Sequence, residues 1–194
     1  MPLSATQLKK WKLLSKEDVS PSSHLPVEKR VYELPDGSTI DDFYVATIPD
    51  SVHVVPVTSE GTVVMVRMYK QGADDFIIQF PAGRFEVDKH GTREKAAVAE
   101  LAEETGIHVS EEDLIKLGAF PIMTTKGTEK FITYLVSDIE LAESGAQNLD
   151  PNEEIEILEL TPDEIDELIC TDGIVDTTAI TNWAVVRLKH PELF

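Results

Sequence analysis

One strongly helical segment separates two groups of strand-like segments, and this order limits the folds that the chain can adopt. Arg93–Thr105 (REKAAVAELAEET) is rich in good helix formers, and Gly106 after it is a common helix stop. Two more helices are expected, from Thr161 to about Ile169 and from about Asp176 to Leu188. We therefore expect an α+β domain in which helices cover a mixed β-sheet, and not a doubly wound domain with regular βαβ alternation. The β-branched and alternating runs that predict its strands are Glu28–Leu34, Thr39–Ile48, Val52–Val57, Thr62–Tyr69, Phe76–Phe80, Leu114–Met123, Phe131–Ile139 and Ile155–Leu160.

The N-terminal region predicts an extension that precedes this domain. Residues 1–26 are polar and contain the cluster Ser20-Pro21-Ser22-Ser23, which is typical of an irregular leader. The turn residues Pro35-Asp36-Gly37-Ser38 join the first two strand-like runs, so these runs predict a β-hairpin. We expect residues 1–49 to form the leader and hairpin, and residues 50–194 to form the main domain.

The charge and the apolar pattern argue against several classes of protein. With 36 Asp and Glu against 17 Lys and Arg, the formal charge is −19, so a nucleic acid polymer would be repelled. The N-terminus lacks the apolar stretch of a signal peptide, and no run of 18 apolar residues predicts a membrane span. Cys170 is the single cysteine, which prevents an intrachain disulfide. These features favour a cytoplasmic protein without a nucleic acid or membrane partner.

Three glutamates share one face of the central helix. Glu100, Glu103 and Glu104 stand at positions i, i+3 and i+4, where each like-charged pair costs roughly 0.2–0.5 kcal/mol. Ala97 and Leu101 belong to a different, apolar face that would pack on a sheet. Mg²⁺ or Mn²⁺ would relieve the repulsion, because these cations prefer oxygen ligands and bridge carboxylates to phosphates. A solvated acidic face is the alternative in so acidic a chain.

The region of this helix resembles the signature of the Nudix hydrolases, G-x5-E-x7-R-E-U-x-E-E-x-G-U, in which U is a bulky aliphatic residue. Gly83 matches the first glycine, and Ala99–Ile107 (AELAEETGI) matches the end. The resemblance implies an α/β/α sandwich that binds Mg²⁺, with Mn²⁺ as a substitute, and that hydrolyses a nucleoside diphosphate linked to another moiety. It assigns the metal ligands to Glu100, Glu103, Glu104 and the carbonyl of Ala82.

The chain departs from this signature in its loop and in its arginine. Gly83 to Ile107 spans 25 residues where the signature spans 23, and Lys89 or Gly91 falls at the first glutamate. Ala99 replaces the arginine that helps to hold the glutamates in the family, which suggests either a substitute cation or a loss of catalysis. The candidates for a substitute are Arg84, Arg93 and Lys95.

From about Val27 onward, the chain is similar to the ADP-ribose and nucleotide-sugar pyrophosphatase branch of this family. The similar segments are VHVVPV, VRMYKQG, IIQFPAG and LDPNEEIEILELTPDEIDELICTDGIVD. The resemblance implies that Glu153, or its neighbour Glu154, orders or deprotonates the attacking water, although both could be ordinary loop acids. It also implies a homodimer, because the hairpin of this branch crosses to the partner subunit. The predicted catalytic residues are Glu153, Glu103 and Glu104, and the predicted substrate-binding residues are Lys70, Arg84 and Glu129.

The sequence thus predicts metal-dependent hydrolysis of ADP-ribose or a related nucleoside diphosphate sugar to a nucleoside monophosphate and a sugar phosphate. A catalytically impaired Nudix-fold module that binds or senses nucleotide or ADP-ribose is the main alternative, and Ala99 would explain it. Hydrolysis of a dinucleoside polyphosphate or of coenzyme A is a second enzymatic alternative.

Overall fold

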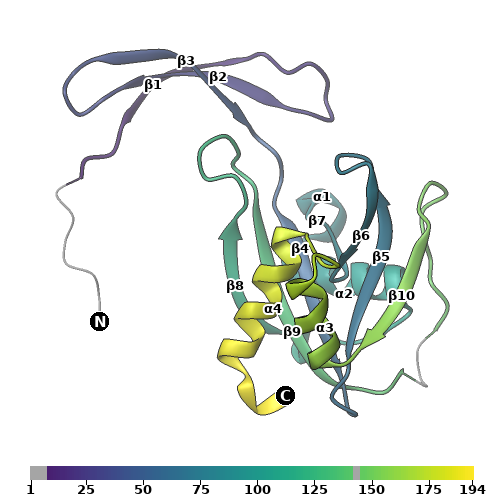
Figure 1. Cartoon of the computed structure of the whole chain (residues 1–194). Coiled ribbons are helices and arrows are strands. Elements are labelled where there is room, and N and C mark those ends of the chain that lie inside the picture. The colour runs from purple at the N-terminus through teal and green to yellow at the C-terminus, as the bar shows by residue number, and fades with distance from the viewer. Residues whose placement is uncertain (1–7, 142–144) are drawn as a thin grey trace. The chain divides into compact units, whose positions relative to one another are not determined.

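The computed structural model describes residues 8–141 and 145–194 and divides the chain into two compact units (Figure 1). One unit comprises Met1–Ile48 and Ile122–Glu129, and the other comprises Pro49–Pro121 and Lys130–Phe194. Among the described residues, no helix has the length and apolar character needed to span a membrane.

The first unit contains a three-stranded antiparallel sheet in the order β1-β2-β3. The strands are β1 (Lys12–Asp18), β2 (Val27–Glu33) and β3 (Thr39–Ala46). The predicted hairpin is therefore present as β2 and β3. The prediction of an irregular leader up to residue 26 was wrong for β1, whose residues are all exposed. The sequence of β1 shows no alternation because neither of its faces is buried, and backbone pairing with β2 defines it as a strand.

The second unit contains a mixed sheet with the strand order β10-β5-β4-β9-β8. In addition, β6 pairs with β5, and β7 pairs with β4. The central pair β4 and β9 is parallel, and the other pairs are antiparallel. The strands are β4 (Ser51–Thr58), β5 (Val63–Lys70), β6 (Asp75–Gln79), β7 (Ala82–Arg84), β8 (Ile115–Pro121), β9 (Lys130–Ile139) and β10 (Ile155–Leu160).

Helices cover both faces of this sheet, as expected for the predicted fold class. Val54 of β4 belongs to a core cluster with Leu101 of α2, whereas the next residue, Val55, belongs to a cluster with Trp183 of α4. Because successive strand residues point to opposite faces, α2 and α4 lie on opposite sides of the sheet. The helices are α1 (Val87–His90), α2 (Arg93–Thr105), α3 (Pro162–Cys170) and α4 (Thr177–Lys189), with short 3-10 turns at Glu111–Asp113 and Pro191–Leu193.

Local sequence signals set the ends of the helices. Thr92 accepts a hydrogen bond from the Lys95 N–H at the start of α2, and Gly106 ends the helix with a φ of 71°. Thr161 forms a capping box with Glu164 at the start of α3. Asp176 accepts a hydrogen bond from the Ala179 N–H at the start of α4. These caps fix the helix that carries the glutamates in the position that the sequence predicted.

Candidate active site

Strand β7 and helix α2 bring the Nudix-like glycine and two of the glutamates together. The Ala82 N–H donates a hydrogen bond of 3.0 Å to Glu104 Oε2. A Cβ atom on Gly83 would lie 2.0–2.2 Å from the three carboxylate atoms of Glu100. Only a glycine lets the backbone approach Glu100 this closely. Pairing of β7 with β4 holds this backbone in place, with His53 opposite Ala82.

Burial makes the two glutamates unusually weak acids. Glu104 is only 5% exposed, and burial, together with the charge of Glu100, raises the pKa of Glu104 to about 8. Burial also raises the pKa of Glu100 to about 7, with a further contribution from Glu103. The Ala82 N–H and Lys70 oppose this rise at Glu104. A nearby cation would therefore stabilise the ionised form of both carboxylates.

Lys89 is a residue of this site that sequence reasoning did not identify. Its charge lowers the pKa of Glu100, so it acts on the carboxylate that follows Ala99 in the chain. The predicted substitute Arg93 is engaged elsewhere, because it pairs with Asp50 at 2.8 Å and lies over the ring of Phe85. Lys89 belongs to α1, which forms within the loop that is two residues longer than the signature. The extra length of this loop was the sequence signal that could have pointed to Lys89.

A pocket of about 380 Å³ lies beside these glutamates and contains two more predicted residues. Lys70 and Glu153 line it together with Met68, Tyr69, Gln71, Phe76, Asn152 and Glu154. The charge of Lys70 lowers the pKa of Glu104, and the charge of Glu153 raises it. Nearby, Gln147 Nε2 donates a hydrogen bond of 2.6 Å to the Glu104 carbonyl, and the Asn148 N–H donates to the Glu103 carbonyl. These bonds dock the acidic loop on α2.

The remaining predicted residues, Glu103, Arg84 and Glu129, do not line this pocket. Glu103 is half-buried on α2, and its charge raises the pKa of Glu100. Arg84 is exposed at the end of β7. Glu129 belongs to the first unit. Within residues 8–141 and 145–194, no three His, Cys, Asp or Glu side chains form a ready metal site. Mg²⁺ commonly uses one or two carboxylates together with substrate phosphates and water, and Glu100 and Glu104 can supply such a pair.

This chain is similar to known proteins in sequence and in fold. It is 28% identical over 181 residues to the ADP-ribose pyrophosphatase of Bacillus subtilis (strain 168), covering 93% of this chain and 94% of that protein. It is 29% identical to the methanol dehydrogenase activator of Bacillus methanolicus, covering 81% and 82% of the two chains. A crystal structure of an ADP compounds hydrolase has the same fold, with a TM-score of 0.80, 19% identity, and coverage of 95% and 96%.

The family assignment rests on a match along most of the second unit. The model of the NUDIX domain matches residues 47–174, which is more than half of the chain. The matched region contains Gly83 and the glutamates Glu100, Glu103 and Glu104 of α2, and it ends at residue 174, before α4 begins at Thr177. The chain therefore belongs to the Nudix family.

Proposed function

We propose that this protein hydrolyses the pyrophosphate of ADP-ribose or of a related nucleoside diphosphate sugar. The products would be a nucleoside monophosphate and a sugar phosphate. The carboxylates of the buried Glu104 and the half-buried Glu100, beside Ala82 and Gly83, carry the proposal, because they provide concentrated negative charge where a cation must bind. The relative named ADP-ribose pyrophosphatase, which aligns along almost the whole chain, supports this choice of substrate.

The donor atoms of this site suit Mg²⁺, with Mn²⁺ as a possible substitute. Glu100 and Glu104 would hold the metal together with the Ala82 carbonyl, and Glu103 would complete the set. Hard oxygen donors favour these cations, and the raised pKa values of Glu100 and Glu104 indicate carboxylates that need a positive partner. When bound, the metal would polarise a phosphate and increase the acidity of a water molecule.

The other residues of the site would position the reactants. Glu153 would orient the attacking water and accept its proton, while Lys70 would neutralise charge on the diphosphate. The water oxygen would bond to one phosphorus, and the bond from that phosphorus to the bridging oxygen would break. Arg84 would contribute a further contact to the substrate.

A binding or sensing module is the second candidate function. Ala99 favours it, since the family arginine beside the catalytic glutamate is absent. In this case the site would bind ADP-ribose or a nucleotide without hydrolysing it. The interaction of Lys89 with Glu100 favours the enzymatic function, because it supplies a positive charge at the glutamate that follows Ala99.

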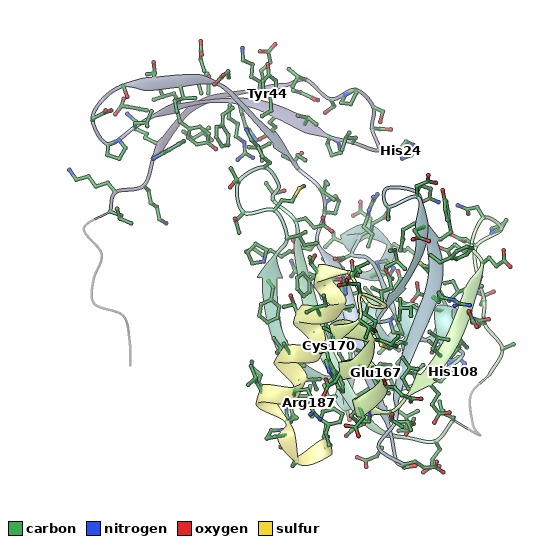
Figure 2. All side chains as sticks on the ribbon, in the orientation of Figure 1. His24, Tyr44, His108, Glu167, Cys170 and Arg187 are labelled. Carbon is green, nitrogen blue, oxygen red and sulfur yellow. The ribbon has the colours of Figure 1, made fainter. Side chains whose placement is uncertain are left out.

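The deciding experiment measures release of nucleoside monophosphate from ADP-ribose, ADP-glucose, GDP-mannose, UDP-glucose, NADH and a dinucleoside polyphosphate. Each substrate is tested with Mg²⁺ and with EDTA, using the unaltered protein, Glu104→Gln and the control Glu167→Gln. Glu167 is an exposed residue of α3, on the face of the sheet opposite α2 (Figure 2). We expect Mg²⁺-dependent turnover that falls by at least about a hundredfold in Glu104→Gln only.

The two candidate functions give different results in this experiment. Equal turnover in Glu104→Gln and Glu167→Gln would refute the assignment of the metal site. Absence of turnover together with thermal stabilisation by ADP-ribose would favour the sensing module. The homodimer and the cytoplasmic location remain predictions that this assay does not address.

A further inference from the structure

The acidic loop, residues 145–154, caps the C-terminal end of helix α2. The last carbonyls of a helix have no partner within the helix itself. Here the Asn148 N–H donates to the Glu103 carbonyl at 2.9 Å, and Gln147 Nε2 donates to the Glu104 carbonyl at 2.6 Å. The loop is therefore bound to the same turn of α2 that carries two of the proposed metal ligands.

The half-buried Gln147 makes its contact through its side chain and also reaches the far end of the loop. The same Nε2 donates a hydrogen bond of 3.3 Å to the carbonyl of Ile155, the first residue of β10. An amide nitrogen carries two hydrogen atoms, so it can serve two carbonyls at once. Gln147 and Ile155 are eight positions apart, and Glu153 lies between them. One side chain thus closes the loop that carries Glu153 and ties it to α2.

Other contacts hold the interior of the closed loop. Leu149 packs against a small core cluster on β5 and β10. The Glu153 N–H donates to the Asp150 carbonyl at 2.9 Å, and the Asp150 N–H donates to Glu153 Oε2 at 3.2 Å. Because these contacts do not involve Gln147, the loss of its two hydrogen bonds should shift the loop relative to α2 without unfolding it.

The distance between the loop and α2 matters for the proposed chemistry. The charge of Glu153 raises the pKa of both Glu100 and Glu104, so the three carboxylates face a common space. A base must lie within about 2.6–3.2 Å of the water that it deprotonates, while the glutamates of α2 position the metal. A shift of about 1 Å between two such groups can lower turnover about a hundredfold. A contact that joins the loop to α2 therefore controls a sensitive distance.

We propose that Gln147 is a positioning residue that sets where Glu153 lies relative to the glutamates of α2. The Gln147 amide is bound to two backbone carbonyls, so it acts through Glu153 and not on the substrate. This inference rests on the proposed function, since it takes Glu153 as the base that activates the water. It adds a residue outside the signature region to those on which turnover depends.

The test measures kcat, the KM for ADP-ribose and the Mg²⁺ concentration needed for half-maximal activity. Gln147→Met keeps the approximate volume of the side chain but removes both N–H donors. We expect kcat to fall about tenfold or more, while the other two values change by less than about twofold. Asn148→Leu is the matched control, because it removes an exposed amide side chain but keeps the N–H that binds the Glu103 carbonyl. It should leave all three values unchanged.

A second comparison separates positioning from general stabilisation. If Gln147 acts through Glu153, then Gln147→Met should lower kcat by less than about twofold in a protein that already carries Glu153→Gln. An equal fall in both backgrounds, or a kcat of Gln147→Met equal to that of Asn148→Leu, would overturn the proposal. A higher Mg²⁺ requirement together with a lower Tm would also overturn it, because the effect would then belong to α2 itself.

Failure of the proposed function would be recognised separately. If the unaltered protein hydrolyses none of the nucleotides, that function is wrong, and amide hydrogen exchange tests the role of Gln147 without turnover. The N–H groups of Asn148 and Glu153 are both hydrogen-bonded in the docked loop. Gln147→Met should increase their exchange rates about tenfold or more and leave those of α4 unchanged. Unchanged rates at both amides, or an equal increase in α4, would overturn the role of Gln147.

Discussion

The geometry of the site depends on the missing side chain of Gly83. In Gly83→Ala, the new Cβ would meet the carboxylate of Glu100 at 2.0–2.2 Å, so Glu100 would have to move. The displaced group is the end of a flexible side chain, and we therefore expect a stability loss of about 1 kcal/mol or less. A shift of about 1 Å at a catalytic group can lower turnover about a hundredfold. Activity and thermal unfolding, measured on the same preparation, would separate these effects.

Gly72→Ala is the control for this substitution. A Cβ on Gly72 would meet no atom within 4 Å, and its backbone does not have a positive φ. We expect neither activity nor stability to change. A Gly83→Ala protein as active as Gly72→Ala would show that the position of Glu100 is unimportant for turnover.

The raised pKa values of Glu100 and Glu104, about 7 and about 8, predict how pH affects the metal-free protein. Above their ordinary value of 4.5, the unfolded chain releases protons that the folded chain retains. The stabilising effect of these groups is therefore complete below 4.5 and disappears as the pH rises to about 8. The free energy of unfolding should fall across this interval, apart from the effects of other groups.

Added Mg²⁺ should reverse this trend, because the metal must displace the same protons. We expect the increase in Tm caused by Mg²⁺ to be larger at about pH 8.5 than at about pH 6. In Glu104→Gln, the dependence on pH should weaken and most of the increase should vanish. An equal increase in Tm at both pH values would contradict the assignment of these carboxylates as ligands.

Sequence patterns predicted elements well where local signals and burial agree. Arg93–Thr105 was predicted with the bounds that α2 has, because strong helix formers lie between a cap and a terminal glycine. Strand β1 was missed since its exposed residues have no alternation, and β7 and α1 were missed inside a polar loop.

Helix α1, which lies in the longer loop, carries Lys89 and gives a prediction about metal binding. If the charge of Lys89 acts on Glu100, then Lys89→Ala should lower the Mg²⁺ concentration needed for half-maximal activity by about three- to tenfold, because an ammonium group beside the carboxylate repels the metal. Lys89→Arg should leave the Mg²⁺ requirement close to that of the unaltered protein, because it keeps the charge. Lys95→Ala is the control from the first turns of α2. An Mg²⁺ requirement that is the same in all three variants would show that α1 has no part in metal binding.

At the scale of the whole molecule, the two units differ in how well they bury apolar side chains. In the described part of the first unit, Val45 is the one hydrophobic residue that is fully buried, whereas the second unit contains extensive core clusters. Nothing in the sequence predicts that Ile122–Glu129 belongs with the N-terminal sheet, although Ala46 bridges to Gly127 there. Such a contact is set by tertiary structure and leaves no local pattern.

The exposed apolar side chains of the first unit predict self-association. Trp11, Leu13, Leu14 and Tyr44 are each 43–47% exposed around a small sheet, and Figure 2 labels Tyr44 on β3. A second copy of the chain could cover this surface, and that would give the homodimer implied by the sequence resemblance. We expect sedimentation to give twice the chain mass of 21.5 kDa at micromolar concentration.

Leu14→Asp should convert the protein to a monomer, because a charge in the interface would lose water without gaining a partner. Leu188→Asp is the matched control, since Leu188 is 81% exposed on α4 in the other unit. It should leave the mass unchanged. If Leu14→Asp also sediments as a dimer, the interface lies outside the first unit. In that case, the exposed apolar side chains of the N-terminal sheet would have to be covered by a partner other than a second copy of the chain.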